Sequence, residues 1–242
     1  DCNPEIGEWD VSSATNMERM FSGAGTLRNN SFNQDIGDWD VGKVENMYCM
    51  LCYAHKFNQD IGRWNVGNVE NTGAMFLYAE NFNQDIGSWD VSNVEKMNGM
   101  FYKAVNFNKD IGDWDVGKVT NMHVLFYHAY KFNQDIGRWN VGNVEYMSST
   151  FAYAESFNQN IGNWTVRSVT TMDSMFLLAT SFNQDIGRWN VGNVQKMSQM
   201  FFMARSFNQD ISRWNVGNVK EMNKMFFHAS SFNQTLCKWK RA

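Results

Sequence analysis

Polar and apolar residues follow two different periods within one recurring unit of the chain. From Phe57 to Ile61 the order Phe-Asn-Gln-Asp-Ile alternates as in a short strand, which would place Phe57, Gln59 and Ile61 on one face. From 69 to 79 the apolar residues recur at spacings of three and four, which is typical of one stripe of a short helix. The unit therefore predicts a strand, a turn and a helix, in that order.

The unit recurs at a fixed spacing, which ten tryptophans mark. From Trp39 onward they lie 25 residues apart, at Trp39, Trp64, Trp89, Trp114, Trp139, Trp164, Trp189, Trp214 and Trp239. The gap from Trp9 to Trp39 is longer and predicts an insertion near 25–30. We predict one tandem-repeat domain over 1–242, with a partial first unit at 1–31, eight repeats over 32–231 and a partial last unit at 232–242.

A single strand–turn–helix unit cannot bury its own apolar face, so stacked copies must share a core. The recurring tryptophan, phenylalanine and methionine positions would fill that core. We expect an α/β repeat fold: a right-handed solenoid of about ten rungs, each with a short parallel strand and a short helix.

The motif Phe-Asn-Gln-Asp-Ile, followed by Trp, Val, Asn-Val, Met and Met-Phe at fixed offsets, resembles the BspA-like leucine-rich-repeat surface proteins, a group first catalogued in mycoplasma lipoproteins. The resemblance covers residues 2–239. It implies a solenoid similar to leucine-rich repeats, an extracellular or cell-surface location, and a role in adhesion or protein–protein contact. It carries no catalytic residues.

Two polar columns accompany the apolar ones. We expect stacked amides to form a structural ladder along the axis, at Asn33, Asn58, Asn83, Asn108, Asn133, Asn158, Asn183, Asn208 and Asn233. Aspartates on neighbouring rungs would repel one another unless turn N–H groups, cations or bound divalent ions offset the charge. Two interpretations of this second column stay open, backbone capping and a surface row that binds calcium or mineral, for Asp35, Asp60, Asp85, Asp110, Asp135, Asp185 and Asp210.

Several classes of function find no support in the sequence. The net charge of −4 shows no basic stripe for nucleic acid, and no apolar run is long enough to span a membrane. The four histidines predict no zinc site, and no catalytic constellation departs from the repeat, so we expect no enzyme. The redox state stays open for Cys2, Cys49, Cys52 and Cys237.

We therefore expect a non-catalytic extracellular scaffold that mediates protein–protein interaction, adhesion or assembly through a regular surface. The alternative is a surface protein that binds divalent cations, mineral or glycan through its asparagine and aspartate columns. No cofactor is expected under the first hypothesis, and calcium is the candidate under the second. An uncovered terminal rung also predicts that the natural chain continues past Ala242 or that this end meets a partner.

Overall fold

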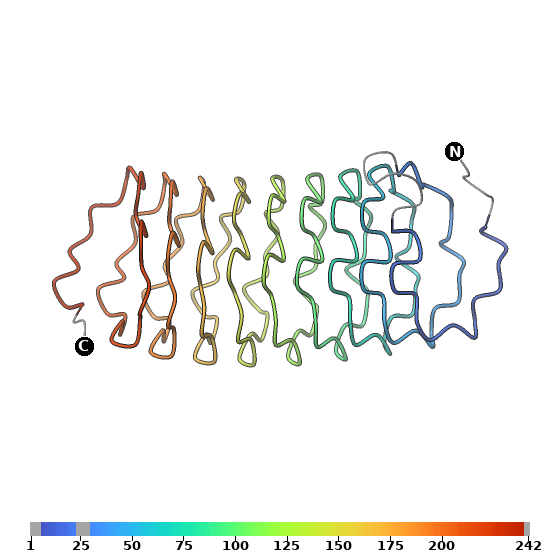
Figure 1. Ribbon diagram of the computed structural model, residues 1–242, viewed down its shortest axis with the longest axis horizontal. Coiled ribbons are helices and arrows are strands. Elements are labelled where there is room, and N and C mark those ends of the chain that lie inside the picture. The colour runs from blue at the N-terminus through green and yellow to red at the C-terminus, as the bar shows by residue number, and fades with distance from the viewer. Residues whose placement is uncertain (1–5, 23–29, 240–242) are drawn as a thin grey trace.

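The computed structural model describes residues 6–22 and 30–239 as a stack of similar coils. Figure 1 shows the coils side by side along the longest axis, in chain order from the blue residues at one end of the stack to the red residues at the other. We define a coil as 25 residues that begin at a phenylalanine, so that the coils are 32–56, 57–81, 82–106, 107–131, 132–156, 157–181, 182–206 and 207–231. The insertion predicted near 25–30 lies outside the described residues except for Asn30.

The predicted fold of strands and helices is wrong. No described residue lies in a helix, and the only extended pairing among the described residues is a row of isolated parallel bridges that runs from Asn16–Asn46 to Lys196–Glu221. The architecture expected of leucine-rich repeats is wrong for the same reason. Since no helix occurs in the described part of the chain, that part contains no helix able to cross a membrane.

Two consecutive turns take the place of the predicted helix. In the coil 57–81 the backbone turns into the left-handed region at Ala74 (φ 54°) and Tyr78 (φ 59°), which ends any helical run. The N–H groups of Thr72, Ala74 and Phe76 bond to carbonyls of the next coil, 24 residues later. The intervening N–H groups bond within the coil, Gly73 to Asn71 Oδ1 and Met75 to the Thr72 carbonyl. The first and fourth residues of each turn point into the core, and in this coil they are Thr72, Met75, Phe76 and Ala79. These buried residues are three, one and three positions apart, which is also the spacing along one face of a helix.

The predicted strand segment pairs through side chains instead of a backbone ladder. Between 58 and 68, no backbone N–H of the described structure bonds to a backbone carbonyl of a neighbouring coil. Asn58 N–H donates to Asn33 Oδ1 at 2.9 Å, and Gln59 Nε2 donates to the Asn33 carbonyl at 2.9 Å. Farther along the coil, Asn68 Nδ2 donates to the Gly42 carbonyl at 2.7 Å. One half of each coil is therefore joined by backbone bonds and the other half by amide side chains.

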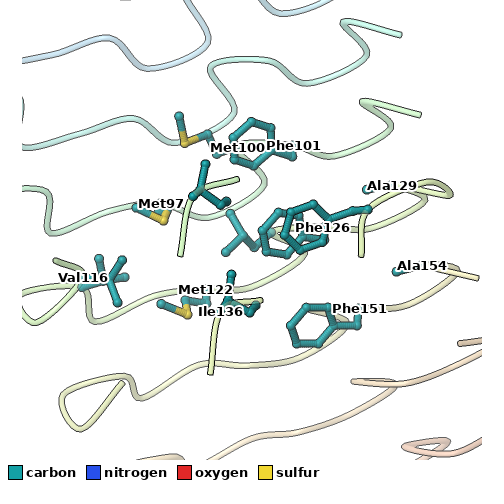
Figure 2. Close-up of a cluster of buried hydrophobic side chains, with 14 of the residues drawn as sticks. Met97, Met100, Phe101, Val116, Met122, Phe126, Ala129, Ile136, Phe151 and Ala154 are labelled. Atoms are coloured by element: carbon teal, nitrogen blue, oxygen red, sulfur yellow. The ribbon is translucent and has the colours of Figure 1, made fainter. Parts of the chain in front are cut away.

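One continuous apolar core runs through the stack. Figure 2 shows part of it, where Phe126 lies between Phe101 and Phe151 of the neighbouring coils and near Met122. The ring centroids of Phe126 lie 5.5 Å from Phe101 and 5.6 Å from Phe151. The tryptophans from Trp39 to Trp214 are buried at 3–4% exposure. Because each indole N–H from Trp39 onward donates to an isoleucine carbonyl of the preceding coil at 3.0–3.1 Å, these polar atoms are satisfied inside the core.

The left-handed turn positions give a test of backbone strain. Val124 is β-branched and has φ 50°, whereas the preceding coil places Gly99 (φ 63°) at the same position. A left-handed conformation costs a non-glycine residue about 1–2 kcal/mol. We expect Val124→Gly to raise the free energy of unfolding by about 0.5 kcal/mol or more, measured by urea denaturation. Val119→Gly is the control, because it removes a fully buried side chain at a position without a positive φ, and it should destabilise the protein. A loss of stability in Val124→Gly would show that Val124 is not strained.

Candidate functional site

The aspartate column lies on exposed turns, where each carboxylate contacts its own backbone. One oxygen of each aspartate accepts the N–H of the residue two positions later at 2.9–3.0 Å, in Asp35, Asp60, Asp85, Asp110, Asp135, Asp185 and Asp210. Asn160 makes the same contact at 3.0 Å in the coil that lacks the aspartate. Backbone and side-chain hydrogen bonds from Ser212 lower the pKa of Asp210.

The described residues contain no group of three or more His, Cys, Asp or Glu side chains placed to hold a metal ion. The aspartate column is thus a row of separate turn caps in this structure. Its role in binding a cation or mineral stays a prediction.

The asparagine column is linked in series from coil to coil. The side-chain oxygens of this column, from Asn33 to Asn208, each accept the backbone N–H of the asparagine in the next coil at 2.9–3.0 Å, and Asn233 is the last donor. The contact joins a side chain to a backbone, whereas the sequence suggested amide-to-amide stacking. It uses the oxygen that would otherwise be offered to a ligand, so this column mainly holds coils together.

The two middle cysteines form a disulfide. Cys49 and Cys52 are bonded, with their Cα atoms 4.8 Å apart, and both sulfurs lie in a small cluster with Ala74 outside the main core. Tyr48 and Tyr53 pack against this cluster. Cys237 is free and exposed, and Cys2 lies outside the described residues.

A row of partly buried tyrosines runs along the second turn of successive coils. We call it the tyrosine strip, and it consists of Tyr53, Tyr78, Tyr102, Tyr127 and Tyr153. Neighbouring ring centroids along it are 4.6–5.6 Å apart. None of these rings belongs to the main core. The strip is thus an aromatic surface that the turns hold outside the buried columns.

Apolar side chains continue the strip toward the last coils. Leu177 and Leu178 occupy the corresponding positions of the next coil, and Phe202 and Phe227 stack with their centroids 5.1 Å apart in the two coils after it. Phe227 is 46% exposed. An apolar surface therefore continues the strip over most of the stack, and it is interrupted as an aromatic row by Leu177 and Leu178.

One basic side chain, Lys103, contacts the centre of the strip. Lys103 Nζ donates to Tyr78 Oη at 3.1 Å and lies 4.6 Å from the centre of that ring, which is a cation–π contact. The hydrogen bond from Lys103 to Tyr78 raises the lysine pKa. Burial raises the pKa of the hydroxyl groups of Tyr102 and Tyr127, so both phenols are neutral near pH 7.

His128 is held neutral beside the strip. Its ring stacks on Tyr153 with centroids 3.9 Å apart, and its Nδ1 lies 2.6 Å from Tyr130 Oη. Burial, and then the charge of Lys103, lowers the pKa of His128 to about 4. At neutral pH the imidazole therefore adds an uncharged aromatic face to the tyrosine strip.

This shifted pKa predicts an acid-dependent loss of stability. The unfolded chain binds a proton at His128 near pH 6.5, but the folded chain does so only near pH 4. The contribution of His128 is therefore complete above pH 6.5 and is lost as the pH falls from 6.5 through 4. We expect His128→Phe, which keeps an aromatic ring against Tyr153, to flatten this part of the stability profile measured by urea denaturation. An unchanged difference between pH 7 and pH 5 in the variant would contradict this assignment.

The hydrophobic pattern of the sequence did not predict the tyrosine strip. The strip tyrosines are not among the apolar residues that recur at spacings of three and four. In a helix they would have lain on the solvent-exposed side, apart from one another. The available signal was the local enrichment of tyrosine at two adjacent positions of five consecutive units. The turn geometry, which the sequence did not reveal, is what brings them into one row.

A family model described as "Mycoplasma protein of unknown function, DUF285" matches the chain three times, over residues 1–86, 78–177 and 155–242. No curated protein and no solved structure matches the chain. The repeat character expected from the sequence is confirmed, as is its mycoplasma type, whereas the BspA-like leucine-rich-repeat assignment is not.

Proposed function

This chain belongs to the Mycoplasma protein family DUF285, and we propose that it is a non-catalytic scaffold that docks protein surfaces on its tyrosine strip. The observation that carries the proposal is the strip itself, a row of stacked aromatic side chains outside the core. Tyrosine is enriched in protein interfaces because its ring buries apolar area while its hydroxyl stays hydrogen-bonded.

The partner to which we commit is a second copy of this chain. A surface whose rings recur every 4.6–5.6 Å can be contacted along its length only by a ligand with a matching period. A second strip has that period by construction. Two strips placed antiparallel would form an isologous contact, in which each strip uses the same residues.

The charge along the strip is compatible with this contact. Lys103 is charged and is already directed at Tyr78, and His128 is neutral. The net charge of −4 over 242 residues gives only weak repulsion between two copies. Electrostatic repulsion therefore opposes the approach of two strips only weakly.

We extend the proposal to display outside the cell and to a role in adhesion. The resemblance to surface proteins supports this location, and so does the Cys49–Cys52 disulfide, because such bonds persist mainly in oxidising surroundings. A scaffold that assembles through its own repeats could present many copies of the remaining surface to a further partner.

Sedimentation velocity of the purified chain tests the proposal. We expect the protein to shift from monomer to dimer as its concentration rises toward about 100 μM, a range typical of a weak interface. Tyr127→Ser should weaken the dimer about tenfold. Tyr146→Ser removes an exposed tyrosine outside the strip and should leave association unchanged. A monomer at all of these concentrations, or equal association of all three proteins, would refute the proposal.

A further inference from the structure

A pocket with several polar side chains in its lining opens along three successive coils, 107–131, 132–156 and 157–181. Its volume is about 320 Å³, and it is lined by Asn121, His123, Tyr146, Ser148 and Thr171. This volume lies at the small end of the range for ligand sites. Tyr146 is 45% exposed and is the only aromatic residue in the column of bridge residues over the described coils.

Hydrogen bonds fix the polar groups around this pocket. Thr171 Oγ1 donates to Asp173 Oδ2 at 3.3 Å, so the 2.7 Å contact between Ser148 Oγ and Thr171 Oγ1 uses the serine hydrogen. Asp173 Oδ1 in turn accepts the backbone N–H of Ser198 at 2.7 Å. Ser148 Oγ is therefore oriented with its lone pairs available as acceptors.

The histidine of the pocket is oriented in the same way. His123 Nδ1 lies 3.0 Å from the Ser148 carbonyl, which can only accept, so the proton of the neutral ring is on Nδ1. Nε2 is then an acceptor. Asn121 Oδ1 already accepts the backbone N–H of His123 at 2.9 Å, which leaves its Nδ2 group as a donor. The pocket thus combines acceptors from Ser148 and His123 with one amide donor and an exposed aromatic ring.

We propose that this pocket binds one pyranose sugar unit. A pyranose presents several hydroxyl donors and one apolar C–H face. The hydroxyls match the acceptors on Ser148 and His123, and the apolar face matches the ring of Tyr146. The inference does not rest on self-association, because the pocket residues are not part of the tyrosine strip.

The other coils lack this combination. At the position of Tyr146, the two preceding coils have Lys96 and Asn121, and the two following coils have Thr171 and Lys196. A charged or short side chain there offers no face for a sugar ring. The proposal therefore gives one sugar site per chain, although the chain is built of repeats.

Saturation-transfer difference NMR with methyl glycosides of glucose, galactose, mannose and N-acetylglucosamine tests the proposal. At least one glycoside should receive saturation, with a dissociation constant in the millimolar range expected for a small open site. Tyr146→Ala and Thr171→Val should each weaken binding of that glycoside about tenfold. Tyr130→Ala is the matched control, because Tyr130 is a second exposed tyrosine (37%) outside the pocket, and it should bind as the natural chain does.

Three results would overturn the sugar site. They are the absence of saturation transfer for every glycoside, equal binding by the pocket variants and the control, and equal saturation of glycerol, which has hydroxyls but no ring face for Tyr146. Circular dichroism spectra of the variants will show that they fold, and sedimentation remains a separate readout for the tyrosine strip.

Discussion

Replacing Phe126 by alanine is expected to lower the free energy of unfolding by about 4 kcal/mol. The side chain is fully buried and stacks on Phe132 with ring centroids 3.9 Å apart. It also contacts Phe101 and Phe151 in the coils on either side. The flanking coils prevent the cavity from closing. The variant therefore loses the free energy of burying the phenyl ring and also bears the cost of the cavity that remains. Urea denaturation followed by tryptophan fluorescence measures the change.

Phe227→Ala is the matched control for this substitution. Phe227 is 46% exposed and stacks mainly on Phe202. Its removal should cost less than about 1 kcal/mol. Similar losses in the two variants would contradict the placement of Phe126 in the core. A stack of coils also divides its stability among neighbour contacts, so Phe126→Ala should broaden the unfolding transition.

Gly87→Ala is expected to lower the free energy of unfolding by about 3 kcal/mol. A Cβ atom at this position would lie 2.6 Å from the Asp110 carbonyl oxygen of the next coil. The obstacle is backbone, which cannot rotate away as a side chain would. Two coils would have to separate, and this would weaken the hydrogen bonds between them. The same urea denaturation measures the effect.

Gly142→Ala provides the comparison. At Gly142 a Cβ atom would meet only the side-chain oxygen of Asn140, at 3.2 Å, so a small rotation relieves the contact. We expect a change below about 1 kcal/mol. Equal effects of the two substitutions would show that coil spacing is not what requires glycine at position 87.

The apolar columns could be read from the sequence, but the backbone that produces them could not. The spacing of Met97, Met100, Phe101 and Ala104 fits both a helical stripe and two successive four-residue turns. The decisive feature is the left-handed conformation at Gly99 and at the lysine before Ala104. Most units place a non-glycine residue at these positions, so no run of glycines marked the turns. Hydrogen bonds to the next coil and burial of the turn residues in the core offset the strain.

The sequence spacing places the polar residues in columns, but the atoms that each side chain contacts could be found only in the structure. A one-dimensional pattern places Asn133 beside Asn158, but it cannot say that the amide oxygen of Asn133 replaces a missing backbone acceptor. Thr150 is a second case. Most coils have methionine at this position, and the sequence does not show that the buried hydroxyl of Thr150 lies within hydrogen-bond distance of the Met122 and Met147 carbonyls.

The tyrosine strip draws its residues from two adjacent positions of the second turn. Tyr102 and Tyr127 recur at the repeat spacing, but Tyr153 is one position later in its unit. A strict column would therefore have separated it from them. In the folded coils its ring still lies 5.5 Å from Tyr127, because two adjacent turn positions share the same surface.

Photo-crosslinking from the centre of the strip tests the central claim most directly. A benzophenone amino acid would replace Tyr127 in ¹⁴N-labelled protein, which is mixed with ¹⁵N-labelled natural chain and irradiated. Mass spectrometry then separates crosslinks between copies from those within one copy. The account predicts crosslinks between copies that map to 100–106, 125–131 or 150–156. Crosslinks that map instead to the aspartate turns, or the absence of any crosslink between copies at about 100 μM, would contradict it.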